Sequence, residues 1–328
     1  MAEAVRGLYP ALAEPSRAGV EALEQRFAEQ AAESESAKRL ERSQAYGREV
    51  ARAILDWAQG DGIAANAGAV YVPATVEGAW EPAPPQFSAN PLEPGWGELR
   101  PMVLASGDEL PPAGHPAFSI NGRSDFYAAA REVYDVGVSL TADEKLIADY
   151  WADGPGSTGT PPGHWTAITS QIARNDGLSL VAAAEAFARV GIALNDAFIC
   201  CWNSKYAFNL QRPLTYINKN INATWLPYIA TPNFPAYTSG HSTQSGAAAF
   251  VLTDLFGEKG FRDTTHQDHS LMQRLQPRSF KSFDEAAAEA AISRLYGGIH
   301  YSFENDDGSA VGRAIGQAIV SRVTFRAG

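Results

Sequence analysis

Cysteine is nearly absent from this chain, which has 328 residues but only two cysteines, Cys200 and Cys201. Two neighbouring cysteines cannot join distant segments, so the sequence excludes a disulfide framework and leaves the redox compartment open. Both lie in an apolar stretch that reads as helix. We therefore expect them to be small core residues rather than a redox pair.

Basic residues are also scarce: 26 Lys and Arg stand against 37 Asp and Glu, which gives a net charge of -11. No basic stripe interleaved with aromatic residues is visible, and such stripes are typical of proteins that bind nucleic acid. The acidic balance also opposes docking on anionic lipid. We therefore expect neither a nucleic-acid partner nor a membrane partner.

Uninterrupted apolar runs are missing as well. The most apolar window, 178–202, contains Glu185, Arg189, Asn195 and Asp196, which exclude a bilayer-spanning helix. The chain begins Met-Ala-Glu-Ala-Val-Arg-Gly, without the charged and then apolar pattern of a secretory signal. We expect a soluble protein. An exported protein that had lost its signal would begin in the same way, so a periplasmic or secreted location stays open.

Alternating β-branched residues are almost absent, whereas apolar residues recur at intervals of three and four, as at Val20, Leu23 and Phe27. The sequence therefore predicts an all-α fold with a helical bundle as its core. The expected helices are 16–59, 124–135, 141–152, 164–175, 178–203, 241–256, 283–298 and 309–325.

Proline and glycine punctuate the stretch from about 63 to 120, which also keeps Trp and Phe residues. This composition favours an ordered loop that wraps the core over a disordered linker. We expect one all-α domain over 1–328. In it, residues 1–123 form N-terminal helices and the irregular loop, and residues 124–328 form the bundle that carries the site.

The first segment that carries chemistry is Lys205-Tyr-Ala-Phe-Asn-Leu-Gln-Arg212-Pro213. Seven residues make two turns of a helix, so we expect Lys205 and Arg212 on one helix face, about 10 Å apart along the axis. Pro213 should end that helix. Two long cationic side chains on one face can converge on one ligand. The alternative is a solvated helix face with two ordinary charges.

The second segment is Tyr237-Thr-Ser239-Gly240-His241, which precedes an alanine-rich helix. The first N–H groups of a helix lack intrahelical partners, and glycine lets an anion approach them closely. The Ser239 hydroxyl adds a donor, and His241 in the first turn would reach the same ligand. The alternative is a plain helix cap with His241 exposed.

The third segment runs from Arg294 to His300 at the end of a helix, with Gly297-Gly298 between them. The glycines would free His300 to turn toward Arg294. Glu304 can hydrogen-bond the far nitrogen of the His300 ring and fix its tautomer. The alternative is a helix end that is stabilised by basic residues.

Together the three segments supply three cations, two imidazoles, a hydroxyl and a glycine, which suits a tetrahedral or trigonal-bipyramidal oxyanion. In order and spacing the segments resemble the signature of the vanadium-dependent haloperoxidases and type 2 phosphatidic acid phosphatases: Lys-x6-Arg-Pro, Pro-Ser-Gly-His and Ser-Arg-x5-His-x3-Asp. The resemblance covers roughly 140–325. Thr238 replaces the usual proline. Glu304 replaces the usual aspartate, for which Asp306 or Asp307 could substitute.

The resemblance implies vanadate as the cofactor, and phosphate fits the same set of groups. The residues that would hold the oxygens of vanadate are Lys205, Arg212, Ser239, Gly240 and Arg294. His300 would be the axial ligand of vanadium, and His241 would be the acid–base group. In a haloperoxidase, Lys205 would polarise bound peroxide. A halide would then attack it and leave as hypohalous acid, which halogenates a small organic acceptor.

Two other activities stay open at this stage. In a phosphatase of the same superfamily, His300 would form a phosphohistidine and His241 would protonate the leaving alcohol. A non-catalytic protein that binds phosphate or vanadate is the third reading, if Glu304 misorients His300. We favour the haloperoxidase, acting on hydrogen peroxide, a halide and a small organic acceptor. Assembly as a homo-oligomer is compatible with the sequence.

Flanking residues refine this hypothesis. Trp202 and Phe234 match positions on the halide side of the haloperoxidase pocket, and a dry aromatic wall suits a weakly hydrated halide better than a phosphoester. Asp196 could support one of the arginines, although a polar residue on a helix face is the simpler interpretation. His164 could border the pocket or lie in a surface turn. His266 and His269 mimic a metal-ligand pair, but we expect them in solvent.

Overall fold

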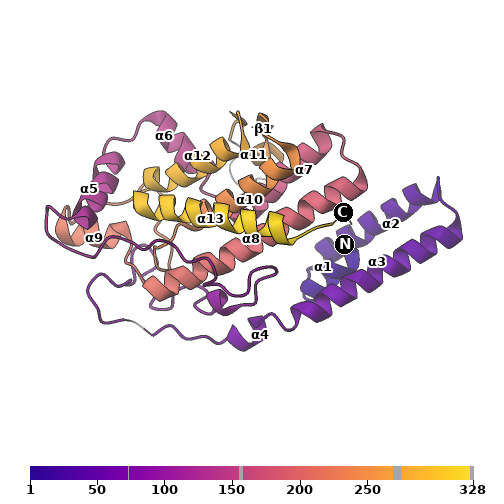
Figure 1. Cartoon of the computed structure of the whole chain (residues 1–328), viewed down its shortest axis with the longest axis horizontal. Coiled ribbons are helices and arrows are strands. Elements are labelled where there is room, and N and C mark those ends of the chain that lie inside the picture. Colours follow the sequence, from indigo (N-terminus) through magenta and orange to yellow (C-terminus); the bar gives the residue numbers. More distant parts are fainter. Residues whose placement is uncertain (73, 155–157, 269–274, 326–328) are drawn as a thin grey trace. The chain divides into compact units, whose positions relative to one another are not determined.

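The computed structural model describes residues 1–72, 74–154, 158–268 and 275–325. The chain divides into two compact units, Met1–Ala65 and Asn66–Gly328 (Figure 1). The sequence predicted a single domain with its internal division near residue 123. In the structure the irregular stretch that follows Ala65 lies in the same unit as the bundle, and the single domain stays a prediction.

The first unit is built from α1 (Ala2–Leu8), α2 (Glu14–Ala32) and α3 (Ala37–Ala58), and the short α4 (Ile63–Asn66) lies at its boundary. The predicted helix 16–59 is thus two helices. Within residues 1–65 only Ala51 is buried. Surface ion pairs such as Arg52 with Glu3 join its helices.

Helices make up nearly all of the regular secondary structure of the second unit, which confirms the predicted all-α class. Its helices are α5 (Asp125–Gly137), α6 (Ala142–Tyr150), α7 (Thr160–Asn175), α8 (Leu180–Phe208), α9 (Pro213–Asn220), α10 (Gly240–Phe256), α11 (Thr265–Asp268), α12 (Phe283–Tyr296) and α13 (Ser302–Arg322), with a 3-10 turn η1 (Trp96–Glu98). Strands β1 (Phe261–Asp263) and β2 (Arg278–Phe280) pair antiparallel, with Phe261 opposite Phe280. Among the described residues no helix is long and apolar enough to cross a membrane.

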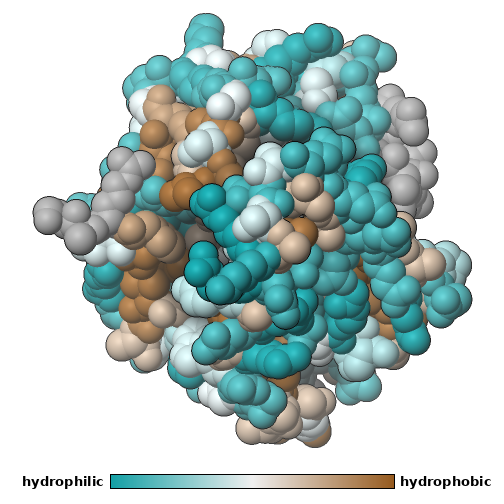
Figure 2. Space-filling view, turned by 90° about the vertical axis from the view of Figure 1, so that its right-hand side faces the viewer, coloured by the Kyte–Doolittle hydropathy of each residue, from teal (hydrophilic) through white to brown (hydrophobic). Residues whose placement is uncertain are grey.

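On the face that Figure 2 shows, hydrophilic surface predominates and apolar surface forms separate patches. This agrees with the acidic composition of the chain. Both cysteines are buried and free, as predicted, with Cys200 and Cys201 inside α8.

Helix α10 is the centre of the bundle and lies against α8, α12 and α13 (Figure 1). Glycines on α13 make its contact with α10 unusually close. A Cβ atom at Gly308 would stand 2.9 Å from the Ser239 carbonyl oxygen, and one at Gly312 only 2.2 Å from the Thr243 carbonyl oxygen. These glycines recur one helical turn apart and face α10, so the two backbones touch directly.

Gly312→Ala is therefore expected to destabilise the protein. Alanine would gain about 1 kcal/mol of helix propensity, but the contact with Thr243 is to main-chain atoms that cannot rotate away. At 2.2 Å the overpacking cost lies at the upper end of the usual range, about 3 kcal/mol. After the gain in propensity about 2 kcal/mol of destabilisation remains, so we expect thermal unfolding to shift down by about 4–8 °C. Gly191→Ala in α8, where a Cβ meets nothing within 4 Å, is the matched control and should be neutral or stabilising. Equal melting temperatures for the two variants would contradict this account.

The irregular stretch of the second unit is fixed on α8, as the prediction of an ordered wrapping loop requires. A Cβ at Gly97 would stand 2.4 Å from the main chain of Asn203, so loop and helix are in direct contact. Asp196 accepts hydrogen bonds from the main-chain N–H groups of Met102, Val103 and Leu104 at 2.6, 2.9 and 3.0 Å. The suggestion that Asp196 supports an arginine is corrected: its carboxylate anchors this loop.

Two local predictions about helix ends are wrong. Lys205 and Arg212 were expected on one continuous helix, but α8 ends at Phe208, because Asn209 adopts a left-handed conformation with φ of 51°. Pro213 does not stop a helix but is the first residue of α9, a position where a missing N–H costs nothing. The stretch from Asn209 to Arg212 is therefore a turn between two helices.

Candidate active site

The three segments meet at one end of α10, although not in the way the spacing predicted. Lys205 lies in the last turn of α8, whereas Arg212 is the residue that caps α9. They therefore do not share a helix face, and it is the turn between α8 and α9 that brings Arg212 back. Ser239 caps the start of α10, and His300 lies between α12 and α13.

Arg212 fixes the position of His300. Its Nη1 atom lies 3.1 Å from Nε2 of His300 and donates to the Ile299 carbonyl oxygen at 3.0 Å. Its Nε atom donates to the Phe234 carbonyl oxygen at 2.8 Å. Because a guanidinium can only donate, Nε2 of His300 must be the unprotonated nitrogen of the ring.

Glu304 completes the same tautomer from the other side of the ring. Nδ1 of His300 lies 2.6 Å from Oε2 of Glu304, which also accepts the N–H of Tyr301 at 3.0 Å. The extra methylene of glutamate thus still reaches the imidazole. Asp307 is used elsewhere and accepts from the Tyr237 hydroxyl at 2.7 Å. His300 consequently presents the lone pair of Nε2, the form in which imidazole ligates a metal.

Lys205 is fully buried and is surrounded by main-chain oxygens. Its ammonium donates to the carbonyl groups of Pro235, Ala236 and Thr238, the first two at 3.2 and 2.8 Å. Burial lowers the pKa of Lys205 to about 8. The segment before Ser239 is therefore folded around the lysine.

Trp202 and Phe234 flank this lysine. Nζ of Lys205 lies 5.7 Å from the ring centre of Trp202 and 5.3 Å from that of Phe234, and the two ring centres are 4.9 Å apart. Phe198 stacks behind Trp202 at 3.9 Å. The predicted aromatic pair thus forms one wall beside the cations.

The start of α10 supplies polar groups to the same region. The Ser239 side chain accepts from the N–H of Ser242 at 3.4 Å, and the N–H of Ser239 donates to the Glu304 carbonyl oxygen at 3.1 Å. A Cβ at Gly240 would meet only ordinary contacts, the nearest being the Trp202 ring at 3.7 Å. Glycine is therefore not required by the packing here, but it leaves the approach to the first N–H groups clear.

His241 faces a carboxylate that the sequence analysis did not find. Its Nε2 atom lies 3.5 Å from Oδ2 of Asp153, which is buried. Burial and the nearby Arg294 lower the pKa of His241 to about 4, and Asp153 opposes this shift. The imidazole is therefore neutral near neutral pH and becomes easier to protonate when an anion offsets Arg294.

Electrostatics show that the groups converge on His300. Burial lowers its pKa well below the usual value, and the charges of Arg212, Lys205 and Arg294 lower it further. Burial also lowers the pKa of each arginine to about 10. None of these three cations forms an ion pair with a carboxylate within the described part of the chain, and Asp153 and Glu304 offset them only in part, so the site keeps a net positive charge.

Two buried donor atoms at this site lack hydrogen-bond partners among the described residues: Nη2 of Arg212 and Nε of Arg294. A buried unpaired donor costs free energy, more so when it is charged. A single oxyanion that accepts from these atoms would satisfy them and neutralise the charge. The residues present therefore fit vanadate or phosphate.

Oxyanion affinity is expected to fall as the pH rises above about 8. Burial puts the pKa of Lys205 at about 8 and raises that of Glu304 to about 8. Above this pH the site loses a positive charge and gains a negative one, and a bound anion favours the protonated lysine. We expect sulfate affinity, measured by calorimetry, to drop roughly tenfold between pH 7 and pH 10. Lys205→Met should bind more weakly at pH 7 and lose less affinity with pH, and a flat profile for the unaltered protein would contradict the assignment.

Comparison with solved structures identifies the family. A crystal structure described as that of the first bacterial vanadium-dependent iodoperoxidase matches with a TM-score of 0.84 and 38% sequence identity, covering 94% of this chain and 75% of that one. The chain belongs to the vanadium-dependent haloperoxidase family. A holo-type bacterial vanadium-dependent chloroperoxidase, at 14% identity and a TM-score of 0.72, shares the fold and covers 98% of this chain and 80% of its own.

Curated members of the haloperoxidase family match over shorter stretches. Vanadium chloroperoxidase of Curvularia inaequalis is 27% identical over 215 residues, which is 47% of this chain and 35% of that protein. Vanadium-dependent bromoperoxidase of Ascophyllum nodosum is 33% identical over 94 residues, 26% of this chain and 17% of that protein. This chain thus spans about a third or less of the curated relatives it matches. The family model "VCPO second helical-bundle domain" matches residues 185–327.

Of the three histidines outside the motifs, two are buried where the sequence suggested exposed positions, and the third is not among the described residues. His164 is not in a surface turn but in the first half of α7, fully buried, where it contacts Asp153. His266 is buried rather than exposed to solvent, and its Nε2 atom lies 2.8 Å from the Tyr150 carbonyl oxygen. His269 lies outside the described residues. Asp153 had no motif around it, so no sequence signal marked it.

Proposed function

We propose that this protein is a vanadate-dependent haloperoxidase, which uses hydrogen peroxide to oxidise a halide to hypohalous acid. The observation that carries the proposal is the conjunction at His300: an imidazole with an unprotonated Nε2, which Arg212 contacts, stands beside unpaired buried donors of Arg212 and Arg294. A ligand that both coordinates nitrogen and accepts several hydrogen bonds fits this conjunction, and vanadate does both.

The side chains and main-chain groups of the site would divide the work of binding vanadate and stabilising charge. The groups that would hold vanadate are the side chains of Lys205, Arg212, Ser239 and Arg294, the main-chain N–H of Gly240, and Nε2 of His300. Bound vanadate, staying at +5, would supply the Lewis acidity that opens hydrogen peroxide to attack by a halide. Because the cations are buried and already oriented by carbonyl groups, they need little reorganisation to stabilise negative charge.

His241 is the group that would move protons. Formation of hypohalous acid from a halide and hydrogen peroxide consumes one proton and releases one water. His241 lies beside the cationic site, and Asp153 faces its Nε2 atom at 3.5 Å. A carboxylate in that position stabilises the imidazolium form and favours the tautomer with the proton on Nε2.

The wall formed by Trp202 and Phe234 is the proposed halide side. Apolar aromatic rings next to the Lys205 ammonium suit a large, weakly hydrated anion, since such an anion loses little on leaving water. We propose iodide as the preferred halide, in line with the iodoperoxidase that is 38% identical to this chain.

The phosphatase alternative shares the anion-holding residues but needs room for the charged ester and its alcohol. The aromatic wall disfavours it, because it gives no polar partner to such a substrate. The non-catalytic alternative required that Glu304 misorient His300. The 2.6 Å contact between Glu304 and the ring removes that reason.

The proposal is tested by loading anion-free protein with orthovanadate and following halogenation of a phenolic dye with hydrogen peroxide and iodide, and then bromide. Turnover that requires vanadate is the expected result. Hydrolysis of an aryl phosphate is measured in parallel. Phosphatase activity without any halogenation would replace the proposed function with the phosphatase, and absence of both activities in vanadate-loaded protein would leave only a binding protein.

A further inference from the structure

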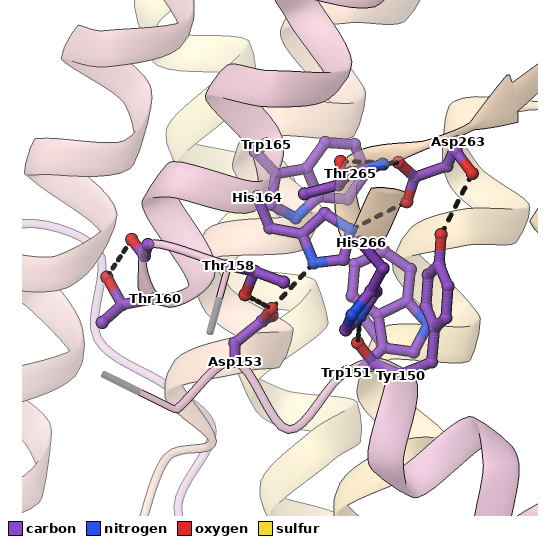
Figure 3. Close-up of polar contacts among 12 residues, drawn as sticks. Tyr150, Trp151, Asp153, Thr158, Thr160, His164, Trp165, Asp263, Thr265 and His266 are labelled. Carbon is purple, nitrogen blue, oxygen red and sulfur yellow. Dashed lines mark hydrogen bonds and ion pairs between the residues drawn. The ribbon is translucent and has the colours of Figure 1, made fainter. Parts of the chain in front are cut away.

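A buried histidine stands between two carboxylates behind the active site (Figure 3). Nδ1 of His164 lies 2.8 Å from Oδ1 of Asp153, and its Nε2 lies 2.7 Å from Oδ2 of Asp263. All three side chains are buried. When both carboxylates are ionised they can only accept, so both ring nitrogens donate and the ring is an imidazolium.

The far end of this row is rigidly anchored. Oδ1 of Asp263 accepts from the Thr265 main-chain N–H at 2.9 Å and from the Thr265 hydroxyl at 2.6 Å, with Nε2 of Gln171 at 3.3 Å. These bonds use the oxygen that does not face His164. Asp263 is thus a fixed support for the imidazolium (Figure 3).

The ring of His164 is also held face-on and edge-on by neighbours. Trp151 stacks on it, with ring centres 4.5 Å apart and planes at 22°. Tyr150 and His266 stand 5.7 and 5.9 Å away. The carbonyl oxygen of Trp151 in turn accepts from Nη1 of Arg294, so the stacking partner of His164 also positions a cation of the active site.

The near end of the row faces the active site. Oδ1 of Asp153 accepts from His164 and from the Thr158 hydroxyl, which leaves Oδ2 directed at Nε2 of His241. Oδ2 has no other partner among the described residues. The orientation of the carboxylate that faces His241 is therefore set by the bonds to its other oxygen.

We propose that His164, clamped between Asp153 and Asp263, is a positioning residue for His241: it keeps Asp153 ionised and turned toward the acid–base imidazole. This inference rests on the proposed function, because it assigns His241 the proton transfer. The row carries two negative charges and one positive charge. One net negative charge therefore remains to act on His241 and Arg294.

Electrostatics agree with this charge assignment. Burial alone would lower the pKa of His164, but the two carboxylates raise it to about 10. Burial alone would raise the pKa of Asp263, but His164 and Thr265 lower it to about 2. The pKa of Asp153 is also lowered, against its burial, by His164 and His241.

The groups that face this row come from every element packed on it. Among the described residues the titratable and charged neighbours are Tyr150 from α6, His266 from α11, His241 from α10, Arg294 from α12 and, opposite Asp263, Arg278 from β2. The two arginines are permanent cations, but Arg278 is paired with Glu289, and Arg294 donates to the Trp151 carbonyl oxygen. His164 is therefore the cation that directly contacts both carboxylates.

The first test reads the ring of His164 without any activity. The chain has six histidines, so single substitutions can assign their ring signals in two-bond proton–nitrogen spectra. In anion-free protein at about pH 8.5, an ordinary histidine is neutral. We expect one doubly protonated ring there, and it should vanish in His164→Phe. If every ring is neutral at that pH, the proposal is overturned.

The second test uses variants. His164→Phe keeps an aromatic ring on Trp151 but removes both donors, so Asp153 should lose its ionised, oriented state. We expect kcat for iodide to fall tenfold or more, KM for iodide and vanadate affinity to change less than threefold, and the nitrogen signals of His241 to shift. His266→Phe removes a buried histidine of the same neighbourhood that does not contact Asp153. It should lower stability but leave kcat and the His241 signals unchanged.

Asp263→Asn serves if His164→Phe does not fold. Asparagine can donate to Nε2 of His164, so the ring should become neutral at pH 8.5 while its bond to Asp153 persists. We expect the doubly protonated signal to disappear and kcat to fall at least threefold. Unchanged kcat and unchanged His241 signals in a folded His164 or Asp263 variant would overturn the proposal. A wild-type protein without haloperoxidase activity would instead refute the proposed function, and the ring spectra would still decide the charge of His164.

Discussion

His300→Ala is expected to lose vanadate affinity by on the order of 100-fold or more, since changing even the groups that support a metal ligand costs about 10–100-fold. The substitution removes the imidazole whose unprotonated Nε2 atom is fixed among the cations, through Arg212 on one side and Glu304 on the other. Phosphate affinity should change far less, within about fivefold, because phosphate needs only the charges and donors that remain. Equilibrium dialysis or calorimetry with each anion measures both values.

Glu304→Gln provides the graded control for this prediction. Glutamine can still accept the proton of Nδ1, but it cannot ionise, so it lacks the negative charge that Glu304 gains around its pKa of about 8 and that makes the imidazole a stronger ligand. We expect vanadate affinity between those of the unaltered protein and His300→Ala, at about tenfold below the former. Equal loss of vanadate and phosphate affinity in His300→Ala would mean that the imidazole merely shapes the pocket and does not coordinate the metal.

His241→Ala should have the opposite profile, with a large loss of turnover and little loss of binding. General acid–base groups contribute roughly 100-fold to 10,000-fold to the rate, and the proposed reaction consumes a proton. In the anion-free protein His241 is neutral, with a pKa of about 4, so it adds no charge to hold the cofactor. We therefore expect kcat to fall at least 100-fold, with vanadate affinity within about threefold.

Turnover with iodide under saturating peroxide, together with vanadate titration of the same variant, measures the two effects separately. The pH profile adds a third readout, because removing the acid–base group should remove the limb of the kcat profile that it controls. A His241→Ala variant that keeps kcat would place the proton transfer elsewhere. One that loses vanadate and kcat together would make His241 a binding residue.

The sequence predicted those parts of the fold that depend on residues close together in the chain. Helical periodicity and capping predicted the helices around the site to within a few residues, such as α10 and α12, because these signals are local. The motif residues Lys205, Arg212 and His300 could be selected because each brings a charge or an imidazole at a recognisable spacing. The structure brings them together, as the hypothesis required.

What the sequence could not reveal depends on tertiary contacts. The left-handed residue Asn209 turns the chain between Lys205 and Arg212, and nothing nearby excluded a continuous helix. Asp153 and His164 are eleven positions apart, but the charged row that they form also requires Asp263, about one hundred positions further along the chain. Local residue spacing cannot predict a partner that is so distant in the chain. The Pro and Gly residues just before His164 also resembled an ordinary turn.

The tight seam of α10 and α13 has a consequence for how this site can evolve. His300 precedes α13 and Ser239 begins α10, and a main-chain hydrogen bond from Ser239 to Glu304 joins the two starts directly. Because Gly308 and Gly312 bring the backbones of α13 and α10 into direct contact, this contact sets the distance between the His300 imidazole and the Ser239 hydroxyl. Side chains that could change rotamer do not set it. Substitutions that change substrate preference are therefore expected in the aromatic wall of Trp202 and Phe234 and in the loops around the site. The distance between the groups at Ser239 and His300 that would hold the anion should stay the same.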